Sequence, residues 1–485
     1  MLFNSLTYIA MMLLALPLVA MSPAWLRRGI FLVGSLTFYS FWRIDFTLLV
    51  VFSAVVDFFA AHGIHASTNE RVRKTFLVIS LTLNLGLLVF FKYTYFIVGS
   101  TQSVGELLGM SFAISLPNII LPLGISFYTF QTISYSIDVF RRIQTPVNNF
   151  PLFLTYVMFW PQLVAGPVLR AHEVLPQLQN HRRANAGEVV RGLEEILQGL
   201  FKKVVLADTI SSVVDYGYGL PVAQMGTIDS WTLAFAFGLQ IYFDFSGYSQ
   251  IAVGSARVLG FNFPQNFNWP YLAVSPRDFW KRWHISLSAW IRDYLYLPLQ
   301  GARFRGASTG GIEAREATEK ISFVRSNVAL LLTWFIMGLW HGAAWRFAVW
   351  GLWHASMIIV YRLLMRRPPK LPKAIVVLGG WSLTTAFAML GWIFFRAPTL
   401  DQAFQMVLRA FDPTALTTMA MRENNYLMTF LYFAGLLVVA GLLRLRTFAV
   451  PTPIRFVVAT GGNAIMIAMV ILFLRDVQQF IYFQF

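Results

Sequence analysis

The 485-residue sequence contains no cysteine. This absence excludes disulfides, thiolate metal sites, iron–sulfur clusters and any cysteine acyl-enzyme intermediate. Charged residues are also scarce, at 12% of the chain, whereas soluble domains carry about 25%. Hydrophobic residues make up 57%. A soluble protein of this composition would leave too much apolar surface in water, so the composition predicts an integral membrane protein.

Positive charge exceeds negative charge, and the net charge is +16. The basic residues form short clusters between apolar runs, as at 71–74 and 366–373. This pattern is typical of cytoplasmic loops that face anionic lipid headgroups, and it gives no support for nucleic-acid binding. Membrane lipids are therefore expected partners, and nucleic acid is not.

The apolar segments predict an all-α, polytopic membrane protein. Since a span needs about 20 residues, we expect about 11 true spans, with the remaining segments re-entrant or interfacial. The first run, 2–21, lacks a basic region before it and is predicted to be a retained helix rather than a cleaved signal peptide. The segments lie at 3–21, 29–42, 46–61, 75–91, 116–140, 151–169, 203–220, 231–257, 326–345, 347–364, 374–395, 425–443 and 456–474.

The basic clusters predict the orientation. Segments 97–115 and 397–424 have no positive excess and are expected outside. The scheme closes only if 143–170, which Pro161, Gly166 and Pro167 interrupt, is re-entrant. The clusters expected in the cytoplasm are 27–28, 71–74, 141–142, 182–203, 303–325, 366–373 and 444–455.

The stretch 258–325 mixes charged and aromatic residues, which favours an amphipathic helix at the membrane–water interface. Its Gly-rich, charged part, 301–320, is predicted to be a flexible cytoplasmic loop.

Three histidines stand among tryptophan and apolar residues. His341 lies near the far end of a run from about residue 326, and about 15 helical residues would carry it roughly 22 Å from the basic loop. An ionisable side chain at that depth indicates a function, and a neutral histidine hydrogen-bonded between helices is an equally good interpretation of this residue alone. His284 also fits an interfacial aromatic belt, and His354 also fits a structural hydrogen bond.

Asp244 is a lone carboxylate in an apolar segment and should face the protein interior. It would orient a catalytic group, line a channel, or pair with an arginine or tyrosine. Gly338 and Gly342 share one helix face, which would let a backbone or a substrate approach closely; plain helix packing explains them equally well.

Two motifs carry a family resemblance. Residues 280–296, WKRWHISLSAWIRDYLY, followed by residues 338–342, GLWHG, resemble the membrane-bound O-acyltransferase (MBOAT) family and, within it, the alginate O-acetyltransferase group. Further matches are LPLGISFY at 121–128, Gly166-Pro167, DFSGYS at 244–249, GWIFFRA at 391–397 and FIYFQF at 480–485.

The resemblance implies a ring of helices around a central funnel, divided into N-terminal spans (1–115), a catalytic core (116–400) and C-terminal spans (401–485) within one membrane domain. His341 matches the signature histidine of the family, and His284 matches its second active-site position. Supporting roles are expected for His354, Asp244, Trp340, Tyr248, Ser246, Arg282 and Trp283.

The resemblance also implies the reaction. Family members move an acyl group from a thioester to a hydroxyl, with no permanently bound cofactor and no metal. In the polysaccharide branch the expected donor is cytoplasmic acetyl-CoA. The expected acceptor is an exported polysaccharide, reached through a periplasmic acetyltransferase or another hydroxyl-bearing partner at the bacterial inner membrane. A hydroxyl needs a general base, and imidazole is the suitable side chain near neutral pH.

Several alternatives remain at this point. A transporter or flippase would use Asp244 and the histidines as a proton relay. A b-type haem protein would use His341 and His354, although the break at 342–346 suggests that the chain reverses between them. Within the family, transfer of D-alanyl or fatty-acyl groups is the main alternative, and a lipid-linked sugar is an alternative acceptor.

Overall fold

The computed structural model describes residues 1–110, 114–163, 166–301, 303–304, 315–316, 322–445, 452–474 and 480–481. The regular elements of this part of the chain are helical except for Arg303–Phe304 (β1) and Arg315–Glu316 (β2), which pair antiparallel. The all-α prediction is confirmed apart from this short pair. Residues 302, 305–314 and 317–320 of the loop predicted at 301–320 lie outside the described residues.

The chain forms two compact units. The first comprises Met1–Gly192, Ser255–Phe263 and Arg292–Ser322, and the second comprises Leu193–Gly254, Pro264–Ile291 and Phe323–Phe485. This grouping does not test the predicted three-part division, which stays a prediction.

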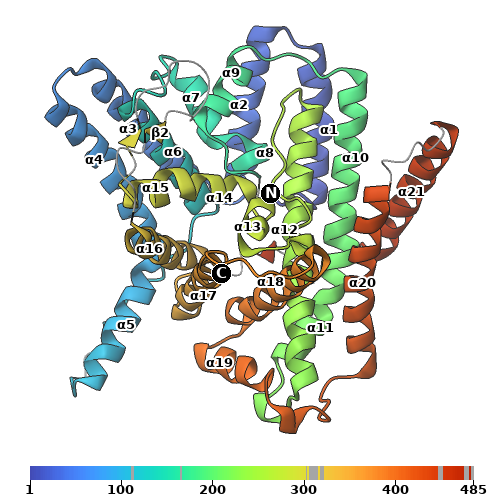
Figure 1. The fold of residues 1–485 in the computed structure, drawn as a ribbon. Coiled ribbons are helices and arrows are strands. Elements are labelled where there is room, and N and C mark those ends of the chain that lie inside the picture. The colour runs from blue at the N-terminus through green and yellow to red at the C-terminus, as the bar shows by residue number, and fades with distance from the viewer. Residues whose placement is uncertain are drawn as a thin grey trace. The chain divides into compact units, whose positions relative to one another are not determined.

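The first unit is built from apolar helices at the start of the chain. Within it, α3, α4 and α6 lie side by side (Figure 1). Its helices are α1 (Leu6–Met21), α2 (Ala24–Ser40), α3 (Ile44–Ala66), α4 (Glu70–Leu88), η1 (Val89–Tyr93), α5 (Thr94–Leu107), α6 (Ile125–Phe140), α7 (Phe150–Met158), α8 (Trp160–Leu163), α9 (Ala171–Gln179), η5 (Arg292–Tyr296) and α15 (Leu297–Leu299). α10 (Ala186–Leu200) begins in this unit.

The second unit contains all three tryptophan-flanked histidines. Most of α12 (Thr227–Val258) belongs to it, as does the last part of α10. Its other helices are η2 (Phe201–Ala207), α11 (Asp208–Tyr218), η3 (Val222–Gln224), η4 (Pro270–Leu272), α13 (Pro276–Arg282), α14 (Ile285–Ile291), α16 (Phe323–His341), α17 (Trp345–Leu364), α18 (Lys373–Arg396), α19 (Leu400–Arg409), η6 (Pro413–Ala415), α20 (Glu423–Leu445) and α21 (Thr452–Phe473).

Glycines set the close packing of α16 on α17, which lie side by side (Figure 1). A Cβ atom on Gly338 would lie 2.2 Å from the Phe347 carbonyl oxygen, and one on Gly351 would lie 2.0 Å from the Trp334 carbonyl oxygen. The two backbones approach this closely because neither position carries a side chain. A backbone therefore occupies the space that Gly338 leaves open.

Among the described residues, six helices are long and apolar enough to cross a membrane. This finding supports a multi-pass membrane protein, while the number of about 11 spans stays a prediction. The six are Ile44–Ala66, Glu70–Leu107, Phe323–His341, Trp345–Leu364, Lys373–Arg396 and Glu423–Leu442.

Two predicted segments are wrong in detail. The span predicted at 116–140 is helical only from Ile125, because Pro122 precedes it and Gly124 adopts a left-handed conformation with a φ of 72°. The single amphipathic helix predicted within 258–325 is instead a series of short helices broken at His284. The predicted interruption of 143–170 is confirmed, since the helical conformation stops at Phe159 and again after Leu163.

Candidate active site

Tryptophan side chains of the second unit surround His354 on α17. The imidazole centroid lies 5.0 Å from the Trp280 ring, 4.9 Å from Trp350 and 5.7 Å from Trp334. His354 is fully buried, and neither ring nitrogen has a hydrogen-bond partner among the residues that the structure describes. The structural hydrogen bond considered for His354 is therefore absent from this part of the chain. A buried polar atom without a partner costs about 1–3 kcal/mol.

His341 is the last residue of α16 and is 4% exposed. Its ring packs edge-on against Trp340 and against Trp350, both at 4.9 Å, and against Phe395 at 5.4 Å. Trp350 therefore contacts both His341 and His354. α17 begins at Trp345, and Gly338 of α16 faces Phe347 whereas Gly351 faces Trp334, so the two helices run antiparallel. The predicted reversal between the two histidines is confirmed. A haem held by both would have to displace Trp350, so the structure gives that alternative no support.

His284 occupies the break between α13 and α14. Its φ is 42°, a left-handed conformation that costs a non-glycine residue about 1–3 kcal/mol and that clusters at functional sites. The ring is buried between Phe245, at 4.6 Å and edge-on, and Phe267, at 6.3 Å and stacked. The His284 ring therefore packs against α12, through Phe245, and against the loop that follows α12, through Phe267.

The hydrogen bonds of Asn266 fix the tautomer of His284. The Oδ1 atom of Asn266 accepts from the backbone nitrogen and the hydroxyl of Ser286 at 3.2 and 2.9 Å, and it lies 3.2 Å from Nδ1 of His284. Since this oxygen is an acceptor, Nδ1 carries the proton. The unprotonated Nε2 has no hydrogen-bond partner among the described residues. It is therefore able to accept a proton or a hydrogen bond from a substrate.

Burial also sets the charge of His284. It lowers the pKa of the imidazole from 6.5 to about 3, because an imidazolium ion would lose its hydration. The side chain is thus neutral at pH 7, and its Nε2 keeps a lone pair that can accept a hydrogen bond.

The tryptophan cluster extends toward His284 through Trp283 and Trp392. The Trp392 ring lies 5.8 Å from Trp350 and 4.8 Å from Trp283, and Trp283 lies 5.2 Å from Phe267. One continuous wall of aromatic rings therefore connects the three histidines within the second unit.

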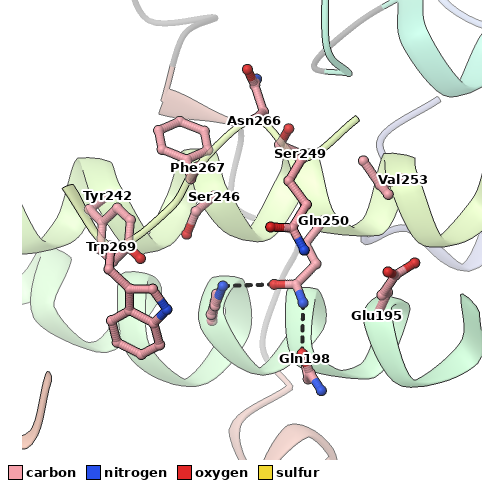
Figure 2. A pocket seen from close by; sticks show the side chains of 12 residues that line it. Glu195, Gln198, Tyr242, Ser246, Ser249, Gln250, Val253, Asn266, Phe267 and Trp269 are labelled. Atoms are coloured by element: carbon pink, nitrogen blue, oxygen red, sulfur yellow. Dashed lines mark hydrogen bonds between the residues drawn. The ribbon is translucent and has the colours of Figure 1, made fainter. Parts of the chain in front are cut away.

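A polar cavity of about 250 Å³ lies beside Asn266. Its walls come from α10, η2, α12 and the loop 265–269, and Figure 2 shows the Gln250 and Gln198 side chains joined across it. The side chains of Ser246, Ser249 and Asn266 line the cavity, and each has a buried polar atom without a partner in the described part of the chain. The cavity is therefore equipped with donors and acceptors for a polar ligand.

The helices around this cavity approach closely at two glycines. A Cβ on Gly199 would lie 2.6 Å from the Gly247 carbonyl oxygen, and one on Gly247 would lie 2.8 Å from that of Gly199. The backbones of α10 and α12 therefore touch at this point, which fixes the position of the lining residues.

Asp244 forms a buried ion pair rather than a free acid. Its Oδ1 atom lies 2.5 Å from Nζ of Lys203, which also contacts Asp208 at 2.8 Å. Its Oδ2 atom accepts the backbone N–H of Ile481 at 3.0 Å. The partner is thus a lysine rather than the arginine or tyrosine considered from the sequence. The pairing leaves Asp244 a poor candidate for a proton relay.

The remaining sequence-predicted residues divide into four groups. Trp340 and Trp283 belong to the aromatic wall, and Ser246 lines the cavity. Tyr248 is buried beneath Phe480, with ring centroids 4.5 Å apart. Arg282 is not brought to the histidines, because its guanidinium pairs with Asp278 at 2.9 Å and contacts the carbonyl of Asn268.

Comparison with known proteins decides the family. A probable alginate O-acetylase AlgI from Azotobacter vinelandii is 38% identical over 420 residues, which cover 85% of this chain and 78% of the relative. The chain belongs to the membrane-bound O-acyltransferase family. The family pattern itself matches residues 140–312, which include His284. The protein is therefore an O-acyltransferase, and the transporter alternative is set aside.

Two further relatives show the range of acyl groups in the family. A peptidoglycan O-acetyltransferase from Helicobacter pylori is 34% identical over 401 residues, covering 77% of this acyltransferase and 72% of the relative. A teichoic acid D-alanyltransferase from Bacillus subtilis is 29% identical over 250 residues, covering 50% and 60% of the two chains.

Sequence reasoning did not identify several residues that shape this site. Trp350 stands in the segment WGLWH, so its spacing of four residues before His354 was a usable signal. Phe245 lies in the DFSGYS stretch, but its contact with His284 joins residues far apart in the chain. Asn266 had no local signal for the same reason.

Proposed function

We propose that this O-acyltransferase moves an acetyl group from cytoplasmic acetyl-CoA, across the bacterial inner membrane, toward hydroxyl groups of an exported polysaccharide. The observation that supports this proposal most strongly is the wall of aromatic rings that joins three buried histidines. The similarity to alginate and peptidoglycan O-acetylating proteins supports it as well. Burial of reactive side chains among tryptophans excludes water, which would otherwise hydrolyse the thioester.

His341 is the proposed general base. A hydroxyl oxygen attacks the thioester carbonyl while imidazole takes the hydroxyl proton, and the departing thiolate then receives that proton. The buried setting at the end of α16 suits this role, since it holds the ring at 4.9 Å from both Trp340 and Trp350. Fixed geometry lowers the entropy cost of the attack.

His284 is proposed to act on the donor side. Its neutral ring presents the unprotonated Nε2, and its Nδ1 is anchored by Asn266, which also lines the polar cavity. We propose that the pantetheine arm of acetyl-CoA enters this cavity. Its two amides and hydroxyl would bond the polar atoms of Ser246, Ser249 and Asn266, and Lys202 in the same lining adds positive charge for the phosphates.

A relay through a partner is proposed for the acceptor side. Acetyl-CoA is cytoplasmic and the polymer is exported, so the acetyl group must pass a bilayer about 30 Å thick. We propose that a periplasmic partner presents a hydroxyl at an outer funnel leading to His341. A lipid-linked sugar entering from the membrane is the alternative acceptor.

Reconstitution in vesicles tests the proposal. Vesicles containing the acyltransferase receive radiolabelled acetyl-CoA on one side and the candidate partner and polysaccharide on the other. Label on the partner or the polymer, and none with partner-free vesicles, supports the relay. Acetylation of free polysaccharide without any partner would contradict it.

D-alanyl transfer is the second candidate, and the similarity to the Bacillus subtilis D-alanyltransferase favours it. A D-alanyl thioester supplied to the same vesicles separates the two. The acetyl proposal requires turnover of acetyl-CoA and none of the D-alanyl donor; the reverse result would replace it.

A further inference from the structure

Phe480 and Ile481 are buried in the second unit, with exposed fractions of 0% and 3%. Both belong to the FIYFQF segment that the family resemblance includes. Residues 475–479 and 482–485 lie outside the described part of the chain. The two described residues contact α12.

The backbone of Ile481 is tied to a buried charge. Its N–H donates to Oδ2 of Asp244 at 3.0 Å, while Oδ1 of the same carboxylate holds Lys203 at 2.5 Å. Hydrogen bonds to an ionised acceptor are about twice as strong as those between neutral groups. This bond therefore fixes the position of the Ile481 backbone along α12.

The ring of Phe480 packs on the same stretch of α12. Its centroid lies 4.5 Å from Tyr248 and 5.5 Å from Phe245. Phe245 in turn stands edge-on to His284, with centroids 4.6 Å apart and an interplanar angle of 89°. Phe245 thus contacts both the Phe480 ring and the His284 ring.

We infer that Phe480 and Ile481 are positioning residues, which hold Phe245 against the His284 imidazole. His284 sits at a left-handed φ of 42°, and Asn266 bonds its ring through Nδ1 at 3.2 Å. The edge-on packing of Phe245 supplies a second restraint on the orientation of the imidazole. Without the Phe480 ring, Phe245 gains room to turn away and water gains access to His284. The importance for turnover rests on the proposed donor-side role of His284; the positioning itself does not.

Chemical modification of His284 tests the positioning directly. The full-length protein in detergent is treated with diethylpyrocarbonate, and mass spectrometry follows modification of His284 relative to the exposed His172. Phe480→Ala should raise the relative rate at His284 at least about tenfold, because local opening exposes a buried group. Phe480→Leu, which keeps most of the volume, should restore most of the protection.

Phe31→Ala is the matched control, since Phe31 is also fully buried but packs within the first unit. In the Phe31→Ala variant, His284 should react at the wild-type rate. An unchanged rate in a well-folded Phe480→Ala protein, or an equal rise in Phe31→Ala, would overturn the inference. If the alanine variant does not fold, the smaller truncation Phe480→Val takes its place, and an unchanged rate at His284 in the folded valine protein would overturn the inference as well.

Turnover of acetyl-CoA is measured on the same variants. Phe480→Ala should reduce it at least about tenfold, because small misplacements of a catalytic group are costly. If His284→Ala retains full turnover, the donor-side role of His284 fails, whereas the modification experiment still decides whether Phe480 positions it.

Discussion

The buried ion pair of Lys203 with Asp244 gives a sharp prediction about stability. Lys203 and Asp244 are each 2–3% exposed in their side chains, and Asp208, at 18%, is the second carboxylate on the same ammonium. Lys203→Met removes the cation and leaves the two carboxylates without it. Removing one partner of a buried pair costs about 3–5 kcal/mol, mostly because the remaining charge is poorly solvated.

Asp244→Asn should cost less, about 1–3 kcal/mol. Lys203 keeps Asp208 as a partner, so no buried charge is abandoned. However, an asparagine offers one oxygen where the carboxylate offers two. Its amide nitrogen must face either the Lys203 ammonium or the Ile481 N–H, both of which are donors.

Chemical denaturation of the purified protein in detergent measures these effects. Lys74→Met is the control, because Lys74 pairs with Glu70 at 2.8 Å on an exposed surface where both side chains are more than half exposed. Its cost should be about 0–1 kcal/mol. The reasoning is refuted if Lys203→Met is as stable as Lys74→Met, or if Asp244→Asn is the less stable of the two variants at the buried pair.

Four further outcomes are expected. His284→Ala should lower acetyl-CoA turnover about 10²-fold while leaving the denaturation midpoint near that of the wild type; unchanged turnover would return His284 to an interfacial role. Because burial lowers the pKa of folded His284 to about 3, the unfolded state binds one more proton than the folded state below about pH 6.5. The contribution of His284 to the free energy of unfolding should therefore be complete above about pH 6.5 and fall as the pH drops, by up to about 1.4 kcal/mol per pH unit. Chemical denaturation at several pH values measures this slope, which His284→Ala should reduce. Gly351→Ala should cost at least about 1–3 kcal/mol because its Cβ would lie 2.0 Å from the Trp334 carbonyl oxygen, whereas Gly379→Ala, with nothing within 4 Å, should be tolerated. In this cysteine-free chain, a cysteine at Met419 should react with an impermeant reagent added outside and one at Lys370 should not; the opposite pattern would reverse the predicted topology.

Composition and motif spacing predicted the membrane class, and the apolar runs placed several helices closely. The run 231–257 corresponds to α12 at Thr227–Val258, because a long apolar segment without internal proline favours one continuous helix. The run 116–140 was placed too early. Pro117, Pro122 and Gly124 were visible in the sequence and are typical of a delayed helix start.

The details of the site could not be predicted in the same way. His284 and His341 are recognisable from their motifs, but the left-handed turn at His284 depends on Asn266, 18 residues away. The sequence placed Lys203 in a basic cytoplasmic cluster. Its pairing with Asp244 could not be predicted, because the two residues are 41 positions apart. Such contacts are set by tertiary packing, which local patterns do not contain.

Acetyl transfer by His341→Ala is the measurement that tests the central claim most directly. The variant and the wild type are reconstituted side by side with labelled acetyl-CoA and the acceptor, and His172→Ala, at an exposed histidine, is the control. The account predicts that His341→Ala inserts and purifies normally but transfers acetyl groups about 10²–10⁴-fold more slowly, as expected for loss of a general base. His172→Ala should match the wild type. Full transfer by a folded His341→Ala protein would contradict the account.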